Sequence, residues 1–234
     1  MKVYRELHPI EKDKHAVVTI GTFDGLHLGH QKIINRMKEV AAGINGETVI
    51  LSFFPHPRMI LHPEDTWLKL LNTIPEKIEL LEKMGVDNLI ITPFTRDFSN
   101  MSCDEFTLKV LADTLHTRKL IIGYDHRFGK NREGGFESLS LSGPVFGFEV
   151  EKIPEQDIDD IAISSTKIRE ALLAGNIETA TKYLQYAYPL HGKVMLGDQI
   201  GRTLGYPTAN ILVTEPYKLI PGDGIYAVRI FVAG

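Results

Sequence analysis

Five short apolar runs, in which hydrophobic residues follow one another without polar alternation, constrain the fold of this chain more than any other feature. Such runs are typical of strands covered on both faces, as in a parallel sheet. We expect these strands at residues 16–20, 48–53, 88–92, 119–122 and 148–151. Helical spacing of apolar residues follows His30, Pro75 and Ser102, the last of which forms a capping box with Glu105. The alternation predicts a doubly wound, Rossmann-like α/β parallel sheet with right-handed crossovers.

The last expected helices precede a change of pattern. Ser164 or Ser165 is placed to cap a helix that Gly175 ends, and a second short helix is expected at residues 177–184. Beyond them the chain is rich in Gly and Pro and looks all-β. We therefore predict an α/β domain at residues 1–185 and a second domain in the rest of the chain.

The second predicted domain covers residues 186–234. Strand-like pieces such as residues 224–230 support its all-β assignment. The chain stops soon after this piece, so we expect an incomplete domain.

Composition and net charge limit the partners and the compartment that we expect for this chain. The 234 residues carry a net charge of -4, which gives no reason to expect a nucleic acid or a membrane as partner. The single cysteine, Cys103, fits a reducing compartment, and we find neither a signal peptide nor an apolar stretch long enough to span a bilayer. We expect a cytoplasmic protein; weak self-association is left open.

The first candidate site is the glycine-containing segment that directly follows the first expected strand and opens a helix, at residues 21–30. In an α/β sheet this position is the carboxyl end of a strand, where ligands bind. Its glycines let the backbone approach a phosphate, and the helix start offers free N–H groups. His27 and His30 bracket Gly29 and can donate to one developing charge. The alternatives are a turn with incidental surface histidines, or a zinc site, for which no third ligand lies nearby.

The second candidate site opens the helix after residue 163. Hydroxyls, helix-end amides and a cation within one turn, as in Ser164, Thr166 and Arg169, suit a phosphate clamp. Taken alone the pattern is weak, because Ser is routine at helix starts and Arg on a helix is usually solvated.

Together the two motifs resemble the HxGH-type nucleotidylyltransferases. Three further segments resemble, more narrowly, the bacterial bifunctional riboflavin kinase/FAD synthetase family. They are residues 53–57 (Phe-Phe-Pro-His-Pro), residues 123–129 (Gly-Tyr-Asp-His-Arg-Phe-Gly) and residues 201–210 (Gly-Arg-Thr-Leu-Gly-Tyr-Pro-Thr-Ala-Asn). The resemblance runs from about Val17 to the last residue, and it implies that the second domain is part of a kinase β-barrel.

The resemblance implies two reactions: riboflavin and ATP give FMN, and then FMN and ATP give FAD and pyrophosphate. Mg²⁺ is the implied cofactor, and the implied site residues fall into four sets. The catalytic set is His27, His30, Ser164, Thr166 and Arg169. The nucleotide-binding set is Gly21, Thr22, Phe23, Asp24 and Gly29. The flavin-binding set is Phe54, His56, Pro57, Gly123, Asp125, Arg127 and Phe128. The kinase nucleotide and metal set is Gly201, Gly205, Thr208 and Asn210.

The residues themselves allow blander interpretations of the last two sets. Prolines after a strand make an extended, rigid loop whose aromatics can stack on a planar ring, but such a Phe often packs in the core. The segment 123–129 is open to interpretation as an ordinary loop. Hydroxyl and amide oxygens at Thr208 and Asn210 suit Mg²⁺, yet a Gly/Pro turn explains them too.

Three further expectations concern activity. The family places the kinase's general-base glutamate beyond its Pro-Thr-Ala-Asn motif, so the 234 residues as given are not expected to phosphorylate riboflavin. A related transferase with another acceptor, such as pantetheine phosphate or nicotinate mononucleotide, would share the histidine motif but not residues 201–210. A non-catalytic flavin- or nucleotide-binding module is the alternative from another class.

Overall fold

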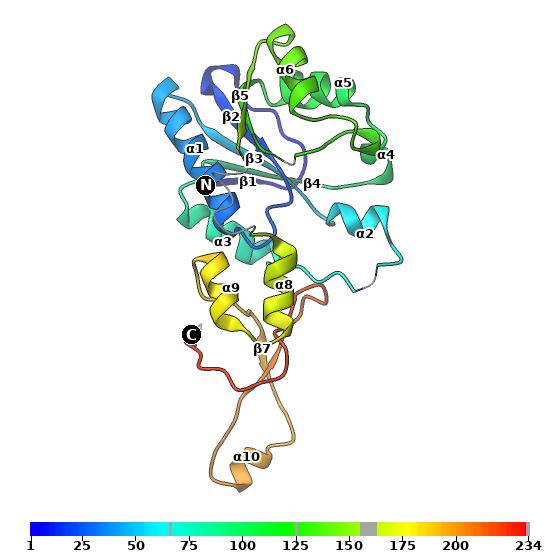
Figure 1. The fold of residues 1–234 in the computed structure, drawn as a ribbon. Helices are drawn as coiled ribbons and strands as arrows, with labels where there is room; N and C mark the ends of the chain where they lie inside the picture. The colour runs from blue at the N-terminus through cyan, green and yellow to red at the C-terminus, as the bar shows by residue number, and fades with distance from the viewer. Residues whose placement is uncertain (66, 125, 155–162, 233–234) are drawn as a thin grey trace.

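The computed structural model describes residues 1–65, 67–124, 126–154 and 163–232. Its centre is a six-stranded, all-parallel sheet with strand order β1-β4-β3-β2-β5-β6 (Figure 1). The strands are β1 (Lys2–Tyr4), β2 (Ala16–Ile20), β3 (Thr48–Phe53), β4 (Asn88–Thr92), β5 (Thr117–Gly123) and β6 (Glu149–Ile153). The five predicted strands and the doubly wound class are confirmed. The sixth strand, β1, was not predicted because it is only three residues long and pairs at the sheet edge with β4.

Helices separate the strands as predicted. They are α1 (Leu28–Ile44), α2 (Pro57–Leu61), α3 (Ile74–Lys83), α4 (Arg96–Ser99), α5 (Cys103–Glu105), the π-helix η2 (Phe106–Thr114) and α6 (Phe136–Val145), with short 3₁₀ turns η1 (Lys12–Lys14) and η3 (Lys130–Arg132). A capping box of Thr73 and Glu76 begins α3, with Pro75 in its first turn. Ser102 and Glu105 form the predicted box ahead of η2.

Two apolar clusters cover the two faces of the sheet. Successive side chains of a strand point to opposite faces, so Val17 packs with α1 and α3 while Val18 packs with η2 and α6. All five residues of β2 are buried. This double burial explains why its sequence shows no polar alternation.

The strand order has its switch point at β2, which pairs with β3 on one side and β5 on the other. The chain leaves β2 in one direction along the sheet and returns later to add β5 on the opposite side. The loops that follow β2 and β5 therefore lie at the shared carboxyl edge of two neighbouring strands, which is where α/β sheets bind ligands. Residues 21–27 follow β2, and Tyr124 and residues 126–129 follow β5.

A third cluster joins the helices α8 (Ser165–Leu173) and α9 (Ile177–Leu184) to Leu71 and Leu219. After it, β7 (Lys193–Met195) and β8 (Asn210–Leu212) pair antiparallel, and a short helix, α10 (Ile200–Thr203), lies at the tip of this hairpin, away from the sheet (Figure 1). This small sheet is consistent with part of a β-barrel. Most apolar side chains of residues 194–232 are exposed.

The strand expected at residues 224–230 is wrong. These residues form no strand and pair with no strand in the part of the chain that the structure describes. A strand needs a neighbour for its N–H and C=O groups, and apolar composition alone does not supply one. In the same described ranges, no helix is long and apolar enough to cross a membrane.

Candidate active site

The loop after β2 adopts an unusual backbone path. Phe23, Gly25 and Leu26 have φ angles of 47°, 87° and 41°, in the left-handed region that non-glycine residues seldom occupy. Surrounding groups hold this path: the Gly25 N–H donates to Asn72 Oδ1 at 2.8 Å, and the Tyr186 hydroxyl donates to the Gly25 carbonyl at 2.6 Å. Strained backbone fixed by its neighbours is often found at ligand sites.

The two motif histidines lie together where α1 begins. His27 is the N-cap residue, and its ring stacks on that of His30 with centroids 3.8 Å apart; the Phe23 ring lies 4.9 Å from His30. Burial lowers the pKa of His30 well below its usual value, and the nearby His27 and Lys77 lower it further. His30 is therefore a neutral imidazole, and its buried Nδ1 has no hydrogen-bond partner among the described residues.

Asp24 is a buried residue of this loop, and both of its carboxylate oxygens accept hydrogen bonds. Its Oδ1 accepts from the N–H groups of Leu71, at 2.9 Å, and Asn72, at 3.2 Å. Its Oδ2 accepts from the guanidinium of Arg169. Burial raises the pKa of Asp24, whereas Arg169 and Lys77 act to lower it. Asp24 thus ties the first motif to the second.

Helix α8 carries the second motif. Ser164 caps it, accepting from the Lys167 N–H at 3.3 Å, and Thr166 is exposed in the first turn. Arg169 Nε donates to the Lys69 carbonyl at 2.7 Å. Ser165, which the sequence offered only as an alternative helix cap, donates from Oγ to the Asp24 carbonyl at 2.8 Å. The structure therefore brings α8 to the histidine loop, chiefly through Arg169 and Ser165.

Lys77 on α3 is a charged residue at this site that the sequence analysis missed. Its Nζ donates to the Thr22 carbonyl at 2.6 Å and to Ser52 Oγ at 3.4 Å, and burial lowers its pKa to about 8. A signal existed in the sequence, because Lys77 falls between Ile74 and Leu81 at helical spacing, on the buried face of α3.

The loop after β3 brings two of the predicted flavin residues near this site. Phe54 is half-buried, with its ring 5.2 Å from that of Tyr217. Burial lowers the pKa of His56 to about 4, and Arg169 and Lys77 contribute to the same shift. The loop is less extended than predicted: His56 caps α2, which Pro57 begins, because proline fits the first turn of a helix.

The loop after β5 places the remaining flavin residues differently from one another. Gly123 ends β5 opposite Ile153 of β6, and Arg127 is exposed, with its guanidinium against Gly135. Phe128 is buried, its ring 5.3 Å from that of Phe106 in the core. Asp125 lies outside the described residues.

The predicted kinase residues lie on the hairpin, apart from the histidine loop (Figure 1). Gly201 is in α10, where a side chain would meet the Tyr206 carbonyl, and Thr208 packs over it. Gly205 has a φ of 81°, and Asn210 on β8 packs against Gly197. Glycine is needed at position 201 because the backbone at Tyr206 approaches it too closely for a side chain.

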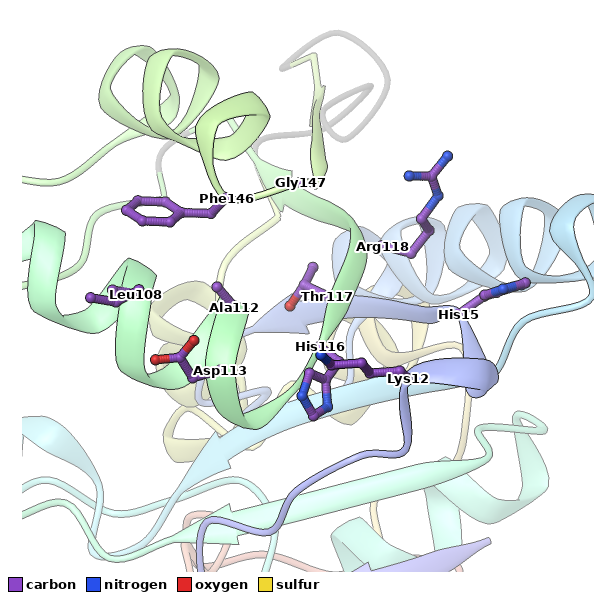
Figure 2. Close-up of a pocket in the computed structure, with 10 residues that line it drawn as sticks. All are labelled: Lys12, His15, Leu108, Ala112, Asp113, His116, Thr117, Arg118, Phe146 and Gly147. Atoms are coloured by element: carbon purple, nitrogen blue, oxygen red, sulfur yellow. The ribbon is translucent and has the colours of Figure 1, made fainter.

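A cavity of about 400 Å³ lies at the other end of the sheet, where β5 begins. Figure 2 shows its lining, which includes His15, His116 and Arg118 and none of the motif residues. This cavity is separate from the candidate site.

A protein-held metal does not fit the site. In the ranges that the structure describes, no three His, Cys, Asp or Glu side chains are grouped so that they could hold a metal ion. Both oxygens of Asp24 are already engaged by N–H donors. Among the described residues, this donor set argues against the zinc alternative.

Comparison with known proteins agrees with this architecture. Residues 9–167 match the FAD synthetase family, and residues 184–234 match the riboflavin kinase family. The bifunctional riboflavin kinase/FMN adenylyltransferase of Listeria monocytogenes is 39% identical over 238 residues, an alignment that covers all of this chain and 75% of that protein. This chain belongs to the bifunctional riboflavin kinase/FMN adenylyltransferase family. The kinase domain of the family is only partly present in these residues.

Solved structures support the fold. A protein from Streptococcus pneumoniae described as a macrolide-efflux protein superposes with a TM-score of 0.82 at 29% identity, over 95% of this chain and 72% of that one. Pantoate-beta-alanine ligase from Francisella tularensis superposes with a TM-score of 0.50 at 15% identity, over 80% of this chain and 78% of its own. The second likeness concerns the fold alone.

Proposed function

We propose that this chain transfers the adenylyl group of ATP to FMN, giving FAD and pyrophosphate. The observation that carries the proposal is the stacked pair of His27 and His30, on a loop that Asp24 and Arg169 fix at the switch point of the sheet. Membership of the family supports FMN as the acceptor.

The reaction is an in-line displacement. A phosphate oxygen of FMN attacks the α-phosphorus of ATP, and the bond from that phosphorus to the bridging oxygen breaks, so that pyrophosphate leaves with the electron pair. Such transfers depend on positioning and on stabilisation of charge. In our proposal His27 and His30 donate to the α-phosphate and to the leaving group. The Lys77 cation lies behind Thr22, where it offsets negative charge.

The other predicted residues surround this centre. Gly21, Thr22, Phe23 and Gly29 line the nucleotide side, while Asp24 fixes the loop from below. Ser164 and Thr166 at the start of α8 hold the β- and γ-phosphates. Arg169 assists them, because a guanidinium has five N–H donors and, among the described residues, hydrogen bonds engage only Nε and one Nη. Mg²⁺ arrives with ATP and offsets the charge of its phosphates.

The flavin is proposed to lie against the loops after β3 and β5. Phe54 and His56 border one side, and Gly123 and Arg127 the other. Because the ring of Phe128 is packed in the core, it contributes by shaping the loop.

The division of labour along the chain is also part of the proposal. Residues 1–185 form the adenylyltransferase domain, and residues 186–234 form the first part of the kinase domain. Gly201, Gly205, Thr208 and Asn210 are assigned to riboflavin phosphorylation within that domain. A cytoplasmic location is proposed because the chain has a single cysteine.

An acceptor comparison tests the proposed function. The chain is incubated with ATP and Mg²⁺ and with FMN, pantetheine phosphate or nicotinate mononucleotide, and the products are separated. We expect FAD and pyrophosphate with FMN and no product with the other two. Turnover of another acceptor only would reject FMN as substrate, and binding of FMN and ATP without turnover would favour the non-catalytic module.

A further inference from the structure

A short segment of the first domain, residues 69–72, is held by the C-terminal part of the chain. Leu70 forms a parallel bridge with Lys218, in which the Leu70 N–H donates to the Tyr217 carbonyl at 2.6 Å and the Leu219 N–H donates to the Leu70 carbonyl at 2.8 Å. Lys69 Nζ donates to the Pro216 carbonyl at 2.7 Å. Residues 216–219 thus form an added strand-like edge for this segment.

Lys218 makes the deepest of these contacts. Its side chain is buried, and its Nζ donates to the Leu71 carbonyl and to Glu76 Oε2, both at 2.7 Å. The same ammonium lies 4.1 Å from the centre of the Tyr188 ring. Glu76 is itself buried and closes the capping box at the start of α3. The ammonium therefore connects α3, segment 69–72 and the C-terminal part of the chain.

The other side of segment 69–72 is bound to the candidate active site. The N–H groups of Leu71 and Asn72 donate to Asp24, and the Asn72 side chain accepts from the Gly25 N–H. Arg169 donates to the Lys69 carbonyl. A displacement of the segment would therefore move the groups that fix the histidine loop.

We infer that Lys218 is a positioning residue for adenylyl transfer: it holds segment 69–72 in place, and the segment in turn holds Asp24 and Gly25. The expected effect of Lys218 on turnover rests on the proposed function. The expected effect of Lys218 on ATP binding does not. A buried ion pair is seldom a large net contribution to stability, since apolar replacements often do as well. We therefore attribute to the Lys218 ammonium a positioning role, in which it holds the Leu71 carbonyl in place.

The test uses the double variant Lys218→Met/Glu76→Gln. Methionine keeps the apolar stem. Glutamine keeps an acceptor for the Thr73 N–H and removes the buried Glu76 charge, which would otherwise lose its lysine partner and keep, among the described residues, only the His191 ring as an ion-pair partner, 3.3 Å from Oε1. The single variant Lys218→Met is measured beside it. Lys193→Met is the matched control, because Lys193 is an exposed lysine of the C-terminal part whose strand, β7, pairs with β8. Circular dichroism at the assay temperature reports the folded fraction.

Three quantities are measured: kcat and KM for FAD synthesis, and the dissociation constant of Mg-ATP by calorimetry. In the folded double variant we expect kcat to fall and both KM and the dissociation constant for ATP to rise, each by about tenfold or more, because small displacements of positioned groups have large effects. Lys193→Met should match the wild type. If Lys218→Met alone does not fold, the double variant decides.

Two results would overturn the inference. One is a folded double variant with wild-type kinetics and ATP affinity. The other is a fall in kcat that only follows the folded fraction, with KM and ATP affinity unchanged, which indicates a purely structural role. If the wild type binds ATP but makes no FAD, the proposed function fails. The comparison of Mg-ATP dissociation constants between the wild type and the double variant still tests the role of Lys218.

Discussion

The carboxylate of Asp24, which is buried, and the guanidinium of Arg169, which is partly buried, form an ion pair between residues 145 positions apart in the sequence. Asp24 belongs to the loop that carries the two histidines, and Arg169 belongs to the helix that carries the hydroxyl motif. The pair also reaches segment 69–72, through the Leu71 and Asn72 N–H groups on Asp24 and the Lys69 carbonyl on Arg169. One contact therefore joins both sequence motifs and the segment that supports them.

Replacing Asp24 by Asn should destabilise the fold. The change leaves the partly buried Arg169 guanidinium without its carboxylate. Because breaking a fully buried pair in this way costs about 3–5 kcal/mol of unfolding free energy, we expect a loss toward the lower end of that range. Urea denaturation measures it. Asp65→Asn is the control, since Asp65 pairs with Arg58 near the surface, where such pairs contribute about 0–1 kcal/mol. Equal effects of the two changes would contradict the role of the Asp24–Arg169 pair.

His30→Ala should impair the chemical step and spare the fold. Loss of one positioned hydrogen-bond donor lowers kcat by about 10²–10³-fold in comparable sites. The free energy of unfolding should change by less than about 1 kcal/mol, because the buried Nδ1 gains no hydrogen bond from the described residues. Exposed His62, replaced in the same way, should leave kcat unchanged. A parallel loss of stability and activity in His30→Ala would indicate a structural role.

Lys77 predicts opposite effects of alkaline pH on activity and stability. Its folded pKa of about 8 lies below the ordinary 10.5, because burial disfavours the charge. FAD synthesis should therefore decline above about pH 8, as the cation beside Thr22 is lost. Between pH 8 and 10.5 the unfolded chain holds a proton that the folded chain has released, so the free energy of unfolding should rise through this window.

Lys77→Met tests the assignment of this alkaline response. The variant lacks the titrating group, so the rise of unfolding free energy between pH 8 and 10.5 should be smaller than in the wild type. Denaturation curves at several pH values measure it. An unchanged rise in Lys77→Met would assign the effect to other groups.

His56 predicts sensitivity to acid. Burial holds its folded pKa at about 4, below the ordinary 6.5, so between these values the unfolded chain binds the proton and the folded chain does not. The contribution of His56 to the free energy of unfolding is fully present above pH 6.5 and is lost as the pH falls toward 4. His56→Asn keeps a cap for α2, since Asn is a good N-cap residue. Its melting temperature should fall less than that of the wild type over this range; an equal fall would exclude His56 as the cause.

Sequence patterns of a few residues predicted those elements of the fold and the site that depend on short-range interactions. The buried strands and the capping boxes at Thr73 and Ser102 follow from short-range chemistry, although only the second box was identified beforehand. The loops after β2 and β5 lie at the same edge of the sheet because neighbouring parallel strands end on one side.

The missed features depend on contacts between distant segments. Asn72 and Tyr186 hold the histidine loop, yet neither lies in a recognisable motif. Lys218 sits in a short Glu-Pro-Tyr-Lys stretch that reads as an ordinary turn, and only the fold buries it against Glu76. At residues 224–230 the sequence predicted an element that does not form, because an apolar run becomes a strand only when another strand pairs with it.

The proposed site geometry serves attack at the α-phosphorus of ATP, and the fate of labelled phosphate tests this most directly. The chain is incubated with FMN, Mg²⁺ and ATP labelled in either the α- or the γ-phosphate, and the label is followed into FAD and pyrophosphate. We predict α-label in FAD and γ-label in pyrophosphate, in equal molar amounts. Transfer of the γ-label to an acceptor without any α-label in FAD would contradict adenylyl transfer at this site.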